Sequence, residues 1–301
     1  MALKNTSTLA LVALIRFIIL SQNPDKLFMC RLFAFKSVLE SKIHQSLIDA
    51  DNALIQQSEK HPDGWGVAYY VENSPHVIKS AQKAIEDKIF QKVSGVVTSH
   101  TVIAHIRNAT LGENNILNTH PFQYGPWVFG HNGNIKDFSK HKEKLMKLVE
   151  NRFKSFILGS TDSEVIFYIL LSQILKSPDT SRAIFTAIES ICQIVGPYET
   201  KDGAESENTF LSFILTDGKK MYAFNGGKTL HYTTHKQSCP ERDSCAFFNS
   251  SCEKQSPNQS KVNHLIISSE PLKGDNVWTK IRPGELILTS GEMIFEKLKF
   301  T

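Results

Sequence analysis

The stretch "KLFMCRLFAFK", residues 26–36, places a cysteine directly behind a methionine and at the head of a β-type run. The run Arg31–Phe35 is typical of a strand. Two methionines, Met1 and Met29, could each begin the chain. If the chain begins at Met29 and this methionine is removed, Cys30 carries both a thiol and a free α-amino group.

A cysteine at the start of a chain can supply its own base. An unperturbed thiol has a pKa of about 8.5 and an α-amino group one of about 7.7–8.0. Near neutral pH the amine is therefore partly neutral and can accept the thiol proton, directly or through water. Such a residue is nucleophile and base together. A buried structural cysteine is the alternative that Cys30 by itself leaves open, because free cysteines are commonly buried.

Residues 1–29 differ in character from the rest of the chain. Residues 9–20, "LALVALIRFIIL", are apolar except for Arg16, and they fall short of the roughly 20 residues that a membrane-spanning helix needs. Lys4 followed by an apolar run resembles a short signal peptide, although no small-x-small cleavage site follows. We interpret residues 1–29 as a leader or an artefactual upstream segment, with a retained anchor as the third alternative, and residues 30–301 as one domain.

Composition restricts the class of protein. The 301 residues are 41% hydrophobic and 21% charged, which is enough apolar material for a sizeable core. The net charge is +4 with scattered Lys and Arg, so nucleic acid is not an expected partner. Five cysteines are too few for a disulfide scaffold and fit a cytoplasmic location without a membrane. The polar loop Cys239–Ser260 has no C-x2-C pair, so zinc is not predicted.

Strand-type and helix-type segments follow one another along the chain. Strands paired antiparallel and interrupted by helix pairs predict an α+β fold with helices packed on sheets. The predicted strands are Arg31–Phe35, Gly66–Val71, Val96–Arg107, Trp127–His131, Phe210–Thr216, Lys219–Phe224 and Val262–Ser268. The predicted helices are Val38–Gln57, Phe138–Phe156, Thr161–Lys176 (with a capping box from Thr161 to Glu164) and Ser181–Val195. Turns are predicted at Asp217-Gly218, at Asn225-Gly226-Gly227 and within Arg282–Leu286.

The segment "VIAHIRNAT", residues 102–110, predicts a strand that ends in an arginine. Alternation puts Ile103, His105 and Arg107 on one face of this strand. An arginine at the end of a buried strand needs an anionic partner. A small-molecule carboxylate suits its planar fork of donors, and a structural ion pair is the alternative.

Two further clusters each allow a structural and a catalytic or binding interpretation. In "GHNGN", residues 130–134, turn chemistry is the default, but the Asn132 amide and the Gly133 N–H could form an oxyanion hole, with glycine allowing close approach to a substrate. In "STDSE", residues 160–164, Asp162 either caps a helix or binds an ammonium group. Together with Arg107 it would then recognise an amino acid.

In this order, these clusters resemble the class II glutamine amidotransferase domain, an N-terminal-nucleophile (Ntn) hydrolase. The matching motifs are Cys30, H-x-R-x-x-T at 105–110, H-N-G at 131–133 and T-D-S-E at 161–164. The segments "HPDGWG", "NTHPF" and "SSEPL" resemble small stand-alone members, which include γ-glutamyl amidohydrolases. The resemblance covers about Cys30 to Leu288.

The resemblance implies a fold and a set of roles. The fold is a four-layer αββα sandwich of two antiparallel sheets between helix layers. Cys30 would attack a γ-carboxamide and form a γ-glutamyl thioester, with its α-amino group as base and without a metal or organic cofactor. The other implied roles are the oxyanion hole for Asn132 and Gly133, carboxylate binding for Arg107 and Thr110, ammonium binding for Asp162, and further substrate contacts for Asn108 and His120.

The sequence departs from the biosynthetic members of that family at Asn108 and Leu111, where an aromatic residue and a histidine are frequent. This departure concerns the acceptor side of the pocket. No second catalytic domain is visible, so the expected substrate is glutamine or a γ-glutamyl small molecule, with an ammonia-accepting or scaffold protein as the class of partner.

Two other hypotheses stay open. One is a silent Ntn-fold binding protein in which residues 1–29 block the Cys30 amine. The other is a metal-dependent hydrolase built from His61, His105, His120 and His131. We disfavour it, because the spacings match no metal motif and Arg107 would repel a cation beside His105.

Overall fold

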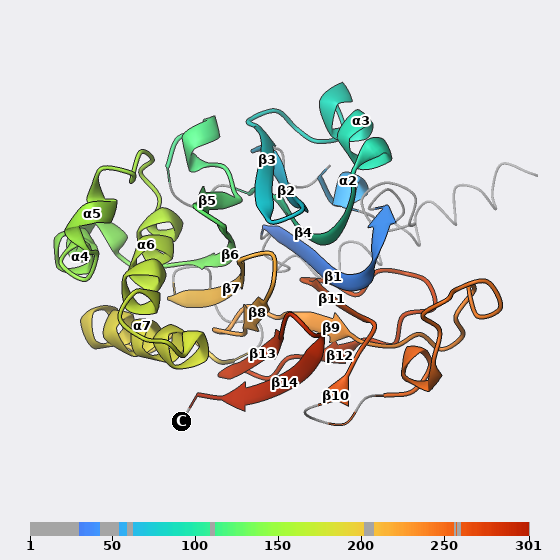
Figure 1. Ribbon diagram of the computed structural model, residues 1–301. Helices are drawn as coiled ribbons and strands as arrows, with labels where there is room; N and C mark the ends of the chain where they lie inside the picture. Colours follow the sequence, from blue (N-terminus) through green and yellow to red (C-terminus); the bar gives the residue numbers. More distant parts are fainter. Residues whose placement is uncertain are drawn as a thin grey trace, which may run out of the picture.

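Two seven-stranded antiparallel sheets lie face to face in the computed structural model (Figure 1). The structure describes residues 30–42, 54–58, 63–108, 112–201, 208–255, 257 and 260–300. In order across the sheet, the first has β12 (Thr279–Lys280), β9 (His231–Thr233), β11 (His264–Ser268), β1 (Arg31–Lys42), β4 (Thr98–Ile106), β2 (Trp65–Val71) and β3 (Ser74–Ser80). The second has β10 (Ser260–Lys261), β14 (Ile294–Lys299), β13 (Glu285–Thr289), β8 (Met221–Phe224), β7 (Phe210–Thr216), β6 (Trp127–Asn134) and β5 (Phe122–Tyr124).

Helices cover the outer face of each sheet. In Figure 1 the four helices beside β5–β8 gather on one side of the molecule, and α3 lies by β2–β4. The helices near the first sheet are α2 (Leu54–Gln57) and α3 (Lys88–Val96). Those near the second are α4 (Phe138–Met146), α5 (Asn151–Lys154), α6 (Asp162–Ile174) and α7 (Thr180–Val195). Two short 3-10 turns are η3 (Ile116–Asn118) and η4 (Ser250–Cys252).

Strand alternation produces three apolar layers, because successive side chains of a strand point to opposite faces. Leu32 and Ala34 of β1 pack between the sheets with Ile103, Val128 and Ile214. The core under α3 contains Phe33, Phe35, Phe90, Val93 and Val102. The core under α6 and α7 contains Phe129, Phe167, Leu170, Ile184 and Ile188. The predicted four-layer αββα arrangement is confirmed.

Most predicted elements form, with three differences. The predicted helix Val38–Gln57 is wrong over its first residues: β1 continues to Lys42, because β4 and the backbone carbonyl of Asn263 pair with it. Residues 43–53 of that prediction lie outside the described residues. The predicted helix Phe138–Phe156 divides into α4 and α5, and Val96 ends α3 instead of beginning β4.

The start of α6 holds one half of the predicted capping box. Thr161 Oγ1 accepts a hydrogen bond from Glu164 N at 3.3 Å. The Glu164 carboxylate turns instead to the preceding loop, where it accepts from Leu158 N at 3.1 Å and from Gly159 N at 2.7 Å. The acidic side chain therefore orders the loop that leads into α6 and to Asp162.

Candidate active site

The thiol of Cys30 lies at the end of the first sheet, where β1 begins and β4 ends. Arg31 is in register with Ile106, so Cys30 and Arg107 occupy neighbouring positions just beyond this pair. The Cys30 thiol donates to the Asn108 carbonyl and accepts from the Asn108 N–H, both at 3.2 Å. The contact of Asn108 with the candidate nucleophile is thus made by its backbone.

The surroundings of Cys30 disfavour a spontaneous thiolate. Burial raises the pKa of its thiol, while the Asn108 N–H and the positive charge of Arg107 act in the opposite direction. Since burial dominates, the thiol stays protonated at neutral pH. A nucleophilic role for Cys30 therefore requires a base close to its sulfur.

Arg107 is held in a fixed position by oxygen atoms of two loops. Its side chain is buried, and its guanidinium donates to Gly112 O at 3.2 Å and to Asp63 O and Asn114 Oδ1 at 3.5 Å. Burial lowers the pKa of Arg107, and the nearby Cys30 and Asp63 oppose this shift. The contacts orient the guanidinium just beyond the end of β4.

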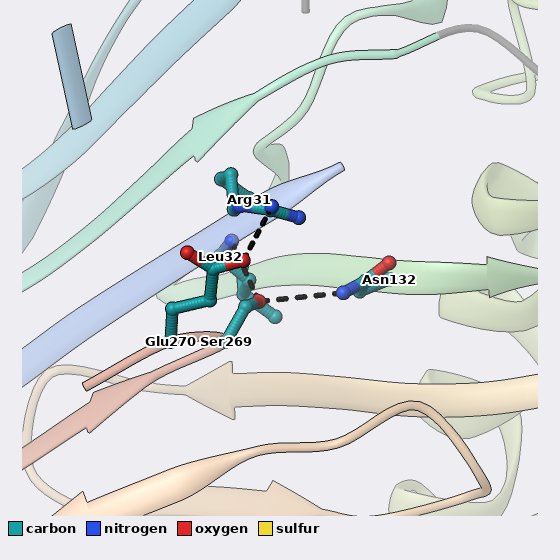
Figure 2. Close-up of polar contacts among 5 residues, drawn as sticks. All are labelled: Arg31, Leu32, Asn132, Ser269 and Glu270. Carbon is teal, nitrogen blue, oxygen red and sulfur yellow. Dashed lines mark hydrogen bonds and ion pairs between the residues drawn. The ribbon is translucent and has the colours of Figure 1, made fainter. Parts of the chain in front are cut away.

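Asn132 reaches toward β1 from the second sheet through one serine. Asn132 Nδ2 donates to Ser269 Oγ at 3.3 Å, and Leu32 N donates to the same oxygen at 3.0 Å. Figure 2 shows these bonds converging on Ser269 beside the Arg31–Glu270 ion pair, whose atoms are 2.5 Å apart. Ser269 thus ties the amide of Asn132 to the strand that follows Cys30.

Gly133 has no room for a side chain. A Cβ at this position would collide with the Phe210 carbonyl oxygen of β7 and lie 2.7 Å from His131 Nε2. Glycine therefore lets β6 and β7 approach each other here while Asn132, the preceding residue, faces the other sheet. The packing explains why glycine follows Asn132, independently of any role of its N–H.

Asp162 is buried at the start of α6 and faces the end of β6. Its Oδ2 accepts from Ile135 N at 2.5 Å, and its Oδ1 accepts from Ser163 N at 2.8 Å. Burial raises its pKa to about 6, against the effect of these N–H groups. A carboxylate that is costly to ionise in this place is suited to receive an ammonium group.

The Asp162 carboxyl should make the stability of the protein depend on pH. Its folded pKa of about 6 exceeds the ordinary 3.8, so the folded state holds the proton more tightly and stability falls as pH rises between these values. From pH 4.5 to 7 this loss is about 2 kcal/mol. Asparagine does not titrate, so Asp162→Asn lacks this loss. The unfolding free energy of the wild type minus that of Asp162→Asn should therefore fall by that amount from pH 4.5 to 7 in urea titrations.

The matched control for Asp162→Asn is Asp179→Asn, since Asp179 caps α7 in an exposed position. The two variants separate the burial of a carboxyl group from the loss of a capping oxygen. A difference between the wild type and Asp162→Asn that stays constant from pH 4.5 to 7 would contradict the raised pKa.

His120 belongs to a row of three buried histidines. The centroids of its ring and the His105 ring are 4.3 Å apart, and the His131 ring is at 6.4 Å. Burial lowers the pKa of His120 well below its usual range, and the charges of His105, His131, Lys79 and Arg107 act in the same direction. His131 Nδ1 and Ser163 Oγ form a hydrogen bond of 2.8 Å. Burial also lowers the pKa of His131, to about 4, so burial favours the neutral form of both His120 and His131.

Some predicted residues cannot be located in this arrangement. Thr110, Leu111 and His61 lie outside the described residues. Among the residues that the structure does describe, no group of three or more His, Cys, Asp or Glu side chains is placed to hold a metal ion. Within the same ranges, no helix has the length and apolarity needed to cross a membrane.

Ser269 is the residue that sequence reasoning missed. It lies in the motif "SSEPL", which contributed to the resemblance without a role for this serine. Its contacts to Leu32 and Asn132 join residues more than one hundred positions apart. The sequence shows only a serine directly after a predicted strand. Its contact with Asn132 depends on how the two sheets stack, which the sequence pattern does not predict.

Comparisons with known proteins agree with this fold. "Probable glutamine amidotransferase DUG3" of Saccharomyces cerevisiae is 29% identical over 87% of this chain and 81% of its own length. The "Gamma-glutamyl-hercynylcysteine sulfoxide hydrolase" of Mycobacterium tuberculosis is 36% identical over 24% of this chain and 31% of its own. A glutamine aminotransferase class-II domain protein from Silicibacter pomeroyi superposes with a TM-score of 0.61 at 21% identity, covering 90% of this chain and 99% of that one.

The two stacked antiparallel sheets between helices define an Ntn-type amidotransferase fold. The model of the family "Glutamine amidotransferases class-II" matches residues 29–298. The chain belongs to this family.

Proposed function

We propose that the protein is an amidohydrolase that cleaves the γ-amide bond of glutamine or a γ-glutamyl compound through Cys30. One observation carries the proposal: the thiol of Cys30, the guanidinium of Arg107 and the amide of Asn132 are connected at one end of the paired sheets. A nucleophile, a cation for a carboxylate and an oxyanion donor are the groups that acyl transfer from an amino acid amide requires.

The first half of the reaction forms a thioester. The Cys30 α-amino group of a chain that begins at this residue takes the thiol proton, and the sulfur attacks the γ-carbonyl carbon. The resulting oxyanion receives hydrogen bonds from the Asn132 amide and the Gly133 N–H. When the intermediate collapses, the C–N bond breaks and the leaving nitrogen takes the proton from the Cys30 ammonium group.

The second half of the reaction regenerates the enzyme. Water attacks the thioester carbon while the α-amino group accepts a proton from it. The same oxyanion donors stabilise the second tetrahedral intermediate. Its collapse releases glutamate and returns the proton to the Cys30 sulfur. The base is needed in the first half because burial raises the pKa of the Cys30 thiol, and in the second half because it takes the proton of the attacking water.

Three side chains provide the amino acid specificity of this proposal. Arg107 binds the α-carboxylate, assisted by Thr110, and Asp162 binds the α-ammonium group. The similarity to the Mycobacterium tuberculosis hydrolase supports γ-glutamyl compounds as substrates besides glutamine. If the leaving group is ammonia, it passes either to water or to an ammonia-accepting partner protein.

The experiment is a glutamate-release assay on two forms of the chain. Every helix and strand of the described structure lies within residues 31–299, so a chain that begins at Cys30 retains all of them. This form should release glutamate from glutamine or γ-glutamyl amides, and the full chain, whose Cys30 amine is in a peptide bond, should not. A folded Cys30 form that releases no glutamate from either substrate class would overturn the proposal.

A further inference from the structure

Lys228 is a buried cation close to the candidate site that the proposed reaction leaves unused. It follows the turn Asn225-Gly226-Gly227 and is only 7% exposed. Its ammonium group lies over the Phe210 ring, 3.4 Å from the ring centroid. Lysine is rarely this buried without an anion. None of the ion pairs formed within the described ranges involves Lys228.

The backbone of Lys228 is fastened to the strand next to Asn132. Ser212 Oγ donates to Lys228 O at 2.6 Å and accepts from Lys228 N at 2.9 Å. Ser212 on β7 is in register with Asn132 on β6, and Phe210 is in register with Asn134. The loop that carries Lys228 is therefore one strand away from the oxyanion donor.

The ammonium group of Lys228 also lies on the same sheet face as Asn132. Alternation along β7 puts Phe210 and Ser212 on the face of Ile214. Ile214 packs between the two sheets with Leu32. Since Lys228 covers the Phe210 ring, its charge lies on this inner face, at the end of the second sheet where Asn132 binds Ser269.

Lys228 and Arg107 flank the candidate oxyanion donor from different sheets. Arg107 ends β4 beside Cys30 in the first sheet. Lys228 approaches from beyond Asn132 in the second sheet. The proposed function assigns the glutamyl part of the substrate to Arg107 in the first sheet, which leaves Lys228 in the second sheet as a cation for the leaving group.

We propose that Lys228 binds a carboxylate on the leaving group of the substrate, so that γ-glutamyl amino acids and peptides are preferred over glutamine. The inference rests on the proposed function and names its substrate class. Glutamine loses ammonia and presents no such carboxylate. A γ-glutamyl amino acid carries two carboxylates, and the pair Arg107 and Lys228 matches them.

The electrostatics of Lys228 agree with a role in binding. Burial lowers its pKa to about 8, and within the described ranges no carboxylate opposes this shift. An incoming carboxylate restores the lost stabilisation of the ammonium charge, and the bond it forms is charge-assisted. The Phe210 ring holds the cation in place until then.

The test compares two substrates that differ in a single charge. γ-Glutamylglycine has a carboxylate on its leaving group, and γ-glutamylglycinamide replaces it with a neutral amide. In the chain that begins at Cys30, Lys228→Gln should raise the KM for γ-glutamylglycine about tenfold or more, as expected for loss of a hydrogen bond between charged groups. The KM for γ-glutamylglycinamide and for glutamine should stay within about twofold of the wild type.

Two further variants distinguish binding from folding. Lys228→Arg keeps the positive charge and should restore most of the affinity for γ-glutamylglycine. Lys297→Gln is the matched control, because Lys297 also lies over aromatic rings, Tyr232 and Phe295, but on β14, three strands from β7. Lys297→Gln should change the KM neither for γ-glutamylglycine nor for γ-glutamylglycinamide. Thermal melting should show that Lys228→Gln, Lys228→Arg and Lys297→Gln are all folded.

The outcomes separate this inference from the proposed function. Equal losses for γ-glutamylglycine and γ-glutamylglycinamide, or no loss for either, would overturn the role of Lys228 while leaving the amidohydrolase intact. If no substrate is turned over at all, the proposed function fails and calorimetry decides the inference. γ-Glutamylglycine should then bind Cys30→Ala protein at least about tenfold more tightly than the double variant with Lys228→Gln, and equal binding would overturn the inference.

Discussion

Replacing Cys30 by alanine should abolish glutamate release while leaving the fold intact. Removal of a nucleophile from a catalytic group that acts as a unit lowers kcat by a factor on the order of 10⁴ or more. The folding cost is small, since Cys30 precedes β1 and its thiol contacts only the Asn108 backbone among the hydrogen bonds of the described residues. Loss of these bonds costs about 1 kcal/mol. Steady-state assays and thermal melting measure the two effects.

The control for Cys30→Ala is Cys192→Ala. Cys192 is also a half-buried free cysteine whose thiol pKa is raised by burial, but it lies on α7 in the outer helix layer. Its replacement should leave kcat within about twofold of the wild type. Mass spectrometry adds a direct readout: a trapped γ-glutamyl adduct should be absent from Cys30→Ala and present in Cys192→Ala. Residual turnover above a few per cent in Cys30→Ala would remove Cys30 from the mechanism.

Alternation along single strands could be predicted from the sequence because it depends on local geometry. Ile103 packs between the sheets while Val102 and Ala104 pack under α3, as the pattern of β4 indicates. The helix predicted at Val38–Gln57 failed at its start for the opposite reason. There, pairing with distant residues decides the structure: β4 pairs with Ser41 and Lys42, and Asn263 O accepts a hydrogen bond from Val38 N.

The candidate site was predictable only as a set of separate motifs. Cys30 and Arg107 could be recognised individually, but their neighbourhood depends on the register of β1 with β4. Ser269 and Lys228 could not be assigned a function, because each acquires its environment from residues distant in the chain. Ser269 meets Asn132 across the two sheets, and Lys228 meets Phe210 through a turn.

Replacing Asn132 by alanine should lower kcat by about 10²- to 10³-fold with little change in KM, the effect expected for loss of one oxyanion donor. The reason is that its amide strengthens its hydrogen bond only when the carbonyl oxygen becomes charged. Asn134→Ala is the matched control, because Asn134 lies on the same face of β6, two residues further along, and its side chain donates to Asn208 O at 2.9 Å. It should retain wild-type kcat.

Ser269→Ala should have a graded effect of the same kind. Ser269 does not contact the scissile carbonyl in the proposed reaction but orients the Asn132 amide relative to β1, and misplacement of a catalytic group by about 1 Å can cost up to 10²-fold in rate. We therefore expect a loss in kcat of about tenfold, between wild type and Asn132→Ala. Ser269→Thr keeps the hydroxyl and should recover part of it.

The double variant Asn132→Ala/Ser269→Ala decides whether the serine acts through the amide. If Ser269 only positions Asn132, its replacement should cost nothing further once the amide is absent, so the double variant should match Asn132→Ala in kcat. Multiplicative losses would instead mean that Ser269 acts on the reaction or on β1 independently, through its bond to Leu32 N. A kcat for Asn132→Ala within about threefold of the wild type would contradict the role of Asn132. Oxyanion stabilisation would then belong to other donors, because loss of a true donor lowers kcat far more.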